Sequence, residues 1–121
     1  MPVKTMTFVS RADLHLHKDW FFLFGDNLLH QGLGGQAREM RREPNAIGIP
    51  TKRRPSMHPE SFFTDADFAE AKAAIDAAFA LIPAGATVVV PAAGIGTGLA
   101  ELPRRAPQIY AYIQSKIAAL A

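Results

Sequence analysis

The stretch WFFLFGDNLLHQGLGGQA, residues 20–37, decides which class of fold the sequence predicts. It opens with Trp20-Phe21-Phe22-Leu23-Phe24, a continuous apolar run of the kind found in strands that are covered on both faces. A glycine-rich segment with an amide and a carboxylate follows, and residues 35–42 then predict a short helix. A buried strand, a glycine loop and a helix in this order are typical of an α/β domain.

Other segments extend this pattern. Residues 3–9, 46–49 and 87–90 predict strands, because they are rich in β-branched residues or apolar throughout. Thr64 and Asp67 have the spacing of a capping box, and apolar residues then recur at helical spacing as far as Ile82. A last amphipathic helix carries Ile109, Ile113, Ile117 and Leu120, with Pro103 or Pro107 in its first turn.

The predicted order β, β, α, β, α, β, α favours a three-layer α/β/α sandwich with a mixed, mostly parallel sheet. A chain of 121 residues fits one such domain with a single core, so we expect residues 1–121 to fold as a unit.

Composition limits the classes of protein. The hydrophobic fraction is 49%, yet no apolar run reaches the roughly 18 residues of a membrane span, and the N-terminus lacks the pattern of a signal peptide. The chain has no cysteine for disulfides or thiolate metal sites. We therefore expect a cytoplasmic protein, and as a separate expectation we take it to be a monomer. The net charge of +2 does not by itself indicate nucleic acid, although Arg41-Arg42, Lys52-Arg53-Arg54 and Arg104-Arg105 could each form a local anion-binding site.

Two glycine-rich loops follow predicted strands and precede predicted helices. Glycine allows a positive φ and close approach to a ligand, and successive amides at a helix N-terminus can bind an anion. Two such loops suggest a diphosphate, although glycines can also serve only tight turns and packing. Neither loop matches the dinucleotide fingerprint or the P-loop. The predicted contacts are Gly32, Gly34, Gly35 and Gln36 in the first loop, and Gly94, Ile95, Gly96, Thr97, Gly98 and Leu99 in the second.

The loops resemble those of the macro domain, a family that binds ADP-ribose. In that family a strand is followed by an Asn that touches the distal ribose and then by a glycine-rich segment, and here Asn27 precedes residues 32–37 at similar spacing. The second macro-domain phosphate loop is similar in placement and glycine spacing to residues 94–99. The resemblance further implies that Asp13 corresponds to the early Asp that meets adenine. It implies a macro-domain-like fold and no cofactor.

Residues 48–52, GIPTK, are similar to one branch of the macro domains. That branch contains the terminal ADP-ribose glycohydrolase and the DarG antitoxin, which remove ADP-ribose from protein carboxylates and from DNA bases. The resemblance assigns substrate contact to Thr51 and catalysis to Lys52. One position departs from the pattern, because Leu99 is followed by Ala100 and then Glu101, where the glycohydrolase has an Asp directly after the Leu.

Lys52 and Asp26 are the candidate catalytic residues. A neutral lysine amine could capture the cationic centre formed when a glycosidic bond to ADP-ribose breaks, and Arg53, Arg54 and partial burial would lower its pKa. Lys52 could equally contact phosphate or be solvated. Asp26 could activate water as a base, or, like Asn27, it could cap a turn.

The histidines and the aromatic pair give weaker signals. His15 and His17 alternate as on a strand or an extended loop, but without further ligands they do not indicate a metal site. His30 lies inside the first glycine loop region and could line it. Phe62 and Phe63 could stack on adenine or pack a loop onto the core.

Three functions remain open at this point. The protein could remove ADP-ribose from a macromolecule, with nucleic acid involved only as a modified substrate. It could bind ADP-ribose without catalysis, which the missing Asp after Leu99 favours. It could also be an α/β domain that binds a partner and no nucleotide.

Overall fold

The computed structural model describes residues 1–121 and contains a four-stranded sheet in the order β1-β4-β2-β3. The strands are β1 (Val3–Met6), β2 (Trp20–Asn27), β3 (Ala46–Lys52) and β4 (Thr87–Pro91). All three strand pairs are parallel, so the sheet is parallel throughout rather than mixed. Antiparallel pairing is confined to an isolated bridge between Lys52 and Phe62.

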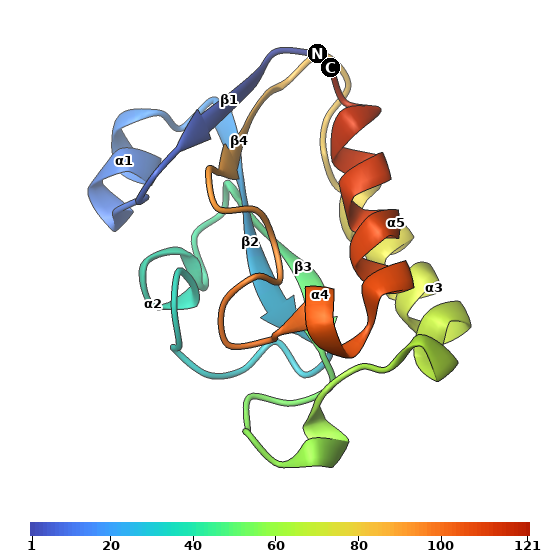
Figure 1. The fold of residues 1–121 in the computed structure, drawn as a ribbon. Helices are drawn as coiled ribbons and strands as arrows, with labels where there is room; N and C mark the ends of the chain where they lie inside the picture. Colours follow the sequence, from blue (N-terminus) through green and yellow to red (C-terminus); the bar gives the residue numbers. More distant parts are fainter.

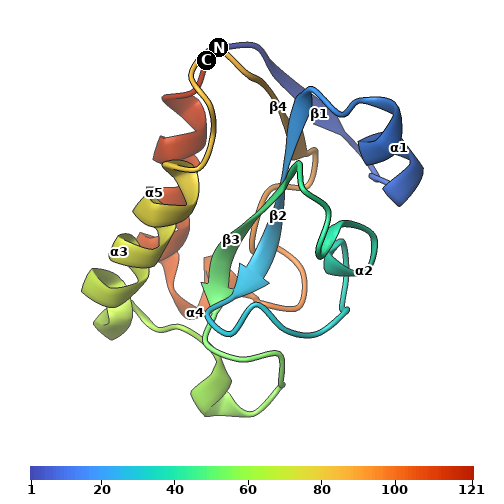
Figure 2. The same ribbon diagram turned by 180° about the vertical axis from the view of Figure 1, so that it is seen from behind.

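Helices cover both faces of this sheet, which confirms the three-layer α/β/α arrangement (Figures 1 and 2). Helices α3 (Phe68–Phe79) and α5 (Pro107–Ala118) lie on one face. Helices α1 (Arg11–Leu16) and α2 (Ala37–Met40) lie on the other. The apolar run of β2 serves both layers, because Leu23 belongs to the cluster under α3 and α5 whereas Phe22 and Phe24 belong to the cluster under α1 and α2. The expectation that this strand is covered on both faces is confirmed.

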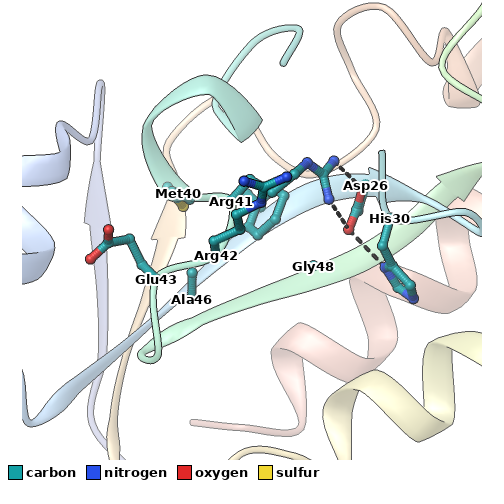
Figure 3. A pocket seen from close by; sticks show the side chains of 9 residues that line it. Asp26, His30, Met40, Arg41, Arg42, Glu43, Ala46 and Gly48 are labelled. Atoms are coloured by element: carbon teal, nitrogen blue, oxygen red, sulfur yellow. Dashed lines mark hydrogen bonds and ion pairs between the residues drawn. The ribbon is translucent and has the colours of Figure 1, made fainter. Parts of the chain in front are cut away.

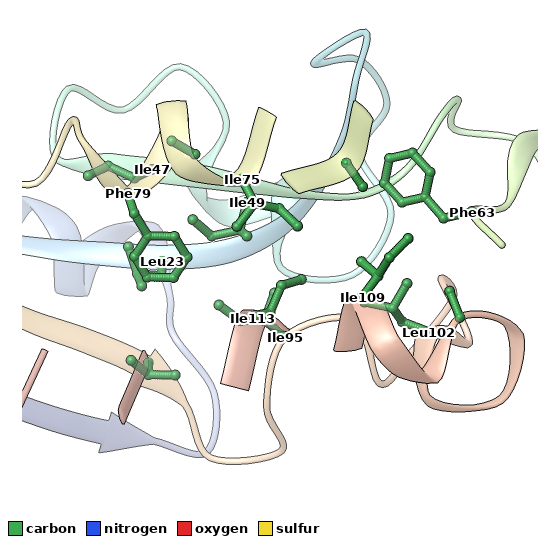
Figure 4. Packing of buried hydrophobic residues seen from close by; sticks show 14 of the residues in the cluster. Leu23, Ile47, Ile49, Phe63, Ile75, Phe79, Ile95, Leu102, Ile109 and Ile113 are labelled. Carbon is green, nitrogen blue, oxygen red and sulfur yellow. The ribbon is translucent and has the colours of Figure 1, made fainter. Parts of the chain in front are cut away.

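The larger core lies between the sheet and the two long helices. Figure 4 shows Leu23 of β2, Ile75 of α3 and Ile113 of α5 pointing into the same interior, and all three are fully buried. Burying a side chain of this size contributes about 1.5–3 kcal/mol to folding. This layer therefore provides the rigid support from which the ends of the strands project.

The predicted signals at the starts of these helices are present. Thr64 and Asp67 form a capping box at a single 3₁₀ turn, Asp65–Asp67, which leads directly into α3. Pro107 lies in the first turn of α5, and Pro103 lies in the first turn of a separate one-turn helix, α4 (Leu102–Arg105). A second 3₁₀ turn, Pro59–Ser61, lies in the connection between β3 and α3.

Helix α1 was not predicted from the sequence. Its start is marked by a capping box in which Ser10 and Asp13 bond reciprocally. His15 lies inside this helix and His17 caps its end, so the interpretation of these two histidines as an alternating extended segment is wrong. The structure shows no group of three His, Asp or Glu side chains that could hold a metal ion. None of the helices combines the length and apolarity that crossing a bilayer requires.

The order of the strands makes two connections diverge at the carboxyl edge of the sheet. The chain leaves β2 toward α2 on one face, and it leaves β4 toward α4 and α5 on the opposite face. Because β2 and β4 are neighbours, their outgoing loops diverge from a common point. In open α/β sheets, this divergence at the carboxyl ends is where ligands bind.

Candidate functional site

The two glycine loops come together at the carboxyl edge of the sheet. A Cβ built on Gly25, near the end of β2, would lie 3.6 Å from the amide nitrogen of Gly96 in the second loop. A Cβ built on Gly34, in the first loop, would lie 3.0 Å from Cδ1 of Leu99. The loops that the sequence singled out as a pair are therefore neighbours in space.

The backbone of both loops offers unpaired donors. The N–H groups of residues 32–37 and of residues 95–100 donate to no carbonyl of the chain. Positive φ values at Gly32 (+88°) and Gly35 (+58°) in one loop, and at Gly94 (+91°) and Gly96 (+88°) in the other, turn these amides away from helical or sheet pairing. Backbone turns of this kind form concave sites for anions. The helices that follow, α2 and α4, have four residues each, so the donors are the loop amides themselves.

Side chains of Gln36 and Thr51 hold these loops in place. The Gln36 side chain accepts from the backbone N–H of Val9 (2.8 Å) and donates to the carbonyl of Val9 (3.0 Å). Thr51 is buried, and its hydroxyl donates to the carbonyl of Asp26 (3.0 Å). Both side chains are thus committed to the fold, and the contribution left to Gln36 at a ligand site is its backbone amide.

Asn27 and Asp13 also use their side chains locally. Asn27 accepts from the amide of Leu29 (3.0 Å) and donates to the carbonyl of Gln31 (2.7 Å), so it closes the turn after β2. The Asp13 carboxylate accepts from the amide (2.8 Å) and hydroxyl (3.0 Å) of Ser10 at the start of α1. The structure therefore gives each residue a capping role, and their contacts to ribose and adenine stay predictions from the resemblance.

Asp26 lies in a fully bonded cluster (Figure 3). Its carboxylate accepts from both terminal nitrogens of Arg41 (2.6 and 3.2 Å), from Nδ1 of His30 (2.9 Å) and from the amide of Asn27 (2.8 Å). Burial by itself would raise the pKa of Asp26, but these bonds outweigh it, so the pKa lies below its ordinary value. A carboxylate held ionised by this many donors is a weak base, and the cluster therefore argues against a catalytic role for Asp26.

Lys52 lies in a different setting at the end of β3. Its side chain is buried, Nζ donates to the carbonyl of Ser56 (2.6 Å), and the ring of Phe62 lies 4.4 Å away. Burial lowers the pKa of Lys52; the negative charge of Glu101 opposes this effect, and the positive charge of Arg105 adds to it. The expected lowering by partial burial is therefore present.

The cations beside Lys52 differ from those expected. Arg53 bonds to Asp67 (2.6 Å) and Glu70 (2.5 Å) on the α3 side, and the positive charge that acts on Lys52 is that of Arg105. The proposal that Arg53 and Arg54 lower the pKa of Lys52 is wrong, because the cation that contributes to the shift is Arg105 and neither Arg53 nor Arg54 does.

Glu101 carries the negative charge nearest to the position where the resemblance expects an Asp. It has a positive φ of 49°, and its carboxylate is paired with Arg104 and Arg105. Ala100 is buried in the preceding position. The carboxylate therefore lies one position later than in the macro-domain pattern, and its negative charge acts on the pKa of Lys52.

The aromatic pair lies in the interior beside Lys52 and Arg105. Phe62 and Phe63 are both buried, and Phe62 lies under the guanidinium of Arg105 at 3.6 Å. Of the two interpretations of this pair, packing of a loop onto the core is the one the structure supports. The segment before it approaches the first glycine loop, since a Cβ on Gly32 would lie 2.8 Å from Cβ of Pro55.

A cavity of about 340 Å³ lies between α2 and the outer strand β3, beside the start of the first glycine loop (Figure 3). It contains one candidate catalytic residue, Asp26, together with His30 and the Arg41-Arg42 pair, which the sequence also singled out. The residues that line it are Phe24, Asp26, His30, Met40, Arg41, Arg42, Glu43, Ala46 and Gly48. The Arg41-Arg42 pair was the signal in the sequence for this cavity. Nothing in the sequence showed that the small residues Ala46 and Gly48 of β3 would lie beneath these arginines.

The fold and the site define a small parallel α/β domain whose sheet edge carries two glycine loops with unpaired amides. The chain belongs to a family of unknown function, DUF7831, whose model matches residues 4–116. No curated protein and no solved structure matches the chain.

Proposed function

We propose that this protein binds ADP-ribose or an ADP-ribosyl group at the carboxyl edge of its sheet. The observation that carries the proposal is the pairing of the two glycine loops, whose amides at residues 32–37 and 95–100 have no carbonyl partner in the chain. Two adjacent sets of amide donors suit the two phosphates of a diphosphate. The adenine and the two riboses of the proposed ligand are inferred from the resemblance of both loops to the macro domain.

In this proposal the amides of Gly34, Gly35 and Gln36 bind one phosphate and those of residues 95–98 bind the other. The distal ribose then lies toward Asn27 and Lys52, which end the neighbouring strands β2 and β3 and are paired in register. The modified molecule, a protein or a nucleic acid, would extend from this ribose into solvent.

Hydrolysis of the ADP-ribosyl link is the second candidate, and the environment of Lys52 favours it. A lowered pKa increases the fraction of neutral amine. The neutral Nζ would form a bond to the anomeric carbon as the bond to the target breaks and the target leaves with the bonding electrons. Water would then replace Nζ on the same carbon. Nζ donates to the carbonyl of Ser56, and a neutral amine that donates in this way keeps its lone pair free for the attack.

Exposed apolar side chains favour the third candidate, binding of a protein partner. Leu33 (64% exposed), Leu99 (59%) and Met57 (55%) lie on the glycine loops and the segment beside Lys52. If this edge binds no nucleotide, these side chains become the main feature that a partner could recognise.

Calorimetric titration with ADP-ribose tests the proposal, with AMP, ribose 5-phosphate and NAD as controls. We expect micromolar affinity for ADP-ribose that exceeds all three. Gly98→Ala is the matched variant, because a Cβ there meets nothing within 4 Å and should leave the fold intact while it obstructs the second loop. Absence of heat with millimolar ADP-ribose would contradict the proposal and leave partner binding as the better hypothesis.

The variant Lys52→Met distinguishes the hypothesis of an enzyme from the hypothesis of a module that only binds. Met keeps much of the side-chain volume and removes the amine. If the protein is a hydrolase, turnover of an ADP-ribosylated protein or DNA should stop while ADP-ribose binding is kept. If it only binds, no turnover should be measured for the wild type, and the substitution should change affinity alone.

A further inference from the structure

We propose that the cavity between α2 and β3 is a second binding site, which takes a phosphate group through Nε2 of His30 and the guanidinium of Arg42. It would accept inorganic phosphate or the terminal phosphate of a small phosphorylated molecule. This site adjoins the first glycine loop through Arg41, but it uses different side chains and does not depend on the function proposed for the loop amides.

The cavity exists because the chain leaves part of the sheet uncovered. Helix α2 is one turn long, and β3 presents only the small residues Ala46 and Gly48 toward it. The apolar wall comes from Phe24 and Met40, both buried. A volume of about 340 Å³ is large enough for a small phosphorylated ligand.

His30 has one nitrogen available to a ligand. Nδ1 bonds to the carboxylate of Asp26 at 2.9 Å, and an ionised carboxylate can only accept, so Nδ1 carries the proton. Nε2 has no partner in the chain, and 64% of the side chain is exposed. Arg41 fixes Asp26 from the other side at 2.6 Å, so the imidazole is held in position by a buried ion pair.

This imidazole is suited to phosphate in both of its protonation states. When it is charged, Nε2 donates to a phosphate oxygen. When it is neutral, Nε2 accepts from the hydroxyl of the phosphate monoanion. A carboxylate or sulfate ligand offers no such proton near neutral pH, so phosphate is the anion that the arrangement favours.

Arg42 supplies the positive charge. Its guanidinium takes part in no hydrogen bond or ion pair of the chain, whereas Arg41 beside it is bonded to Asp26 and to the carbonyl of Gly32. Glu43 also lines the cavity, but its carboxylate is paired with Arg11 and with His15 (2.7 Å) on α1. The charge of Arg42 is therefore the one that a ligand can use.

The backbone at both residues adopts the left-handed conformation. Three non-glycine residues of the chain have a positive φ, and two of them, His30 (53°) and Arg42 (72°), line this cavity. Residues other than glycine, Asn, Asp and His rarely adopt this conformation, so Arg42 is the more unusual of the two, and such residues often lie at functional sites. Arg42→Asn removes the charge and introduces a residue that tolerates the conformation.

The test is a titration of ¹⁵N-labelled protein with inorganic phosphate to 20 mM at constant ionic strength, followed by the amide resonances. We expect saturable shifts at Arg42 and Gly48, and at least tenfold weaker binding in Arg42→Asn and in His30→Asn. Thermal stability of Arg42→Asn should equal or exceed that of the wild type, which shows that the loss is not due to unfolding. Arg38→Ala is the matched control, since Arg38 lies on α2, four residues before Arg42, and its side chain forms no hydrogen bond and does not line the cavity.

Three results would overturn the proposal: no shift at Arg42 and Gly48 at 20 mM phosphate, equal binding by Arg42→Asn and wild type, or shifts confined to residues 32–37 and 95–100. The last result would show phosphate at the glycine loops, so failure of this site is distinguishable from failure of the function proposed above. Ribose 5-phosphate and AMP, titrated in parallel, distinguish a site for free phosphate from one that also accepts a phosphorylated molecule.

Discussion

Asp26 and Lys52 are both charged groups removed from water at the ends of neighbouring strands, but their surroundings are opposite in character. Asp26 has a donor for each carboxylate oxygen, and its most important partner is a cation. Lys52 has a carbonyl, a thioether and an aromatic ring around Nζ, and no carboxylate within ion-pair distance. A fully paired charge stabilises a fold, whereas a charge without a counter-ion can change its protonation state and is the better candidate for chemistry.

The largest effect should come from breaking the Asp26 cluster. Arg41→Ala leaves a buried carboxylate without its counter-ion, and we expect the free energy of unfolding to fall by roughly 3 kcal/mol in urea denaturation. The double variant Asp26→Asn/Arg41→Met should recover most of this loss, because it removes both charges together. A change below about 0.5 kcal/mol for Arg41→Ala would mean that the pair is not a structural element.

The next effect should come from the strand beneath Asp26. A Cβ on Gly48 would lie 2.3 Å from Oδ2 and 2.8 Å from Cβ of Asp26, so Gly48→Ala forces the carboxylate out of its cluster. We expect a loss of about 2 kcal/mol, measured in the same way. Gly98→Ala, whose Cβ has no neighbour within 4 Å, should stay within about 0.5 kcal/mol of the wild type. Equal losses for the two variants would contradict the role assigned to Gly48.

Lys52→Met should have a small effect on stability that depends on pH. Because the folded state lowers the pKa of Lys52 below 10.5, it disfavours the charged form, and the wild type loses stability as pH falls through the lowered pKa. The stability of Lys52→Met relative to the wild type should therefore decrease as pH rises toward 10.5. At pH 7 we expect the two to differ by no more than about 1 kcal/mol. If the stability of Lys52→Met relative to the wild type increased as pH rises, the folded state would instead raise the pKa of Lys52.

The smallest effect concerns a charge that is paired at the surface. Asp76 of α3 bonds to Tyr112 of α5 and to Lys72 (3.0 Å), and these bonds lower its pKa from 3.8 to about 2. Its contribution to stability is present above pH 3.8 and is lost as pH falls from there toward 2. Tyr112→Phe should move the carboxyl titration, followed by NMR, upward toward 3.8. An unchanged titration would show that Tyr112 does not hold this carboxylate.

Local patterns in the sequence predicted the parts of the fold that depend on local chemistry. The apolar run of β2, the Thr64–Asp67 capping box and the proline at the start of α5 each express a preference of a few consecutive residues. Helix α1 was missed although it carries the same signal, because Asp13 was interpreted as a ligand contact and not as the partner of Ser10.

The candidate site was predictable only in its backbone. The glycine spacing located both loops, because glycine marks the positive φ values that turn the amides outward. The partners of the charged side chains depend on the tertiary fold instead. Arg41 reaches Asp26 from the far side of the glycine loop, and Arg105 reaches the surroundings of Lys52 from α4, so neither contact leaves a pattern in the sequence.

The central claim is that the unpaired amides of the two glycine loops bind the diphosphate of ADP-ribose. Titration of ¹⁵N-labelled protein with ADP-ribose tests it most directly, because each amide reports separately. We predict the largest shifts at residues 32–37 and 95–100, saturating at micromolar ligand, with much smaller shifts at Gly48. Saturable binding that leaves these amides unchanged, or no shift at millimolar ADP-ribose, would contradict it.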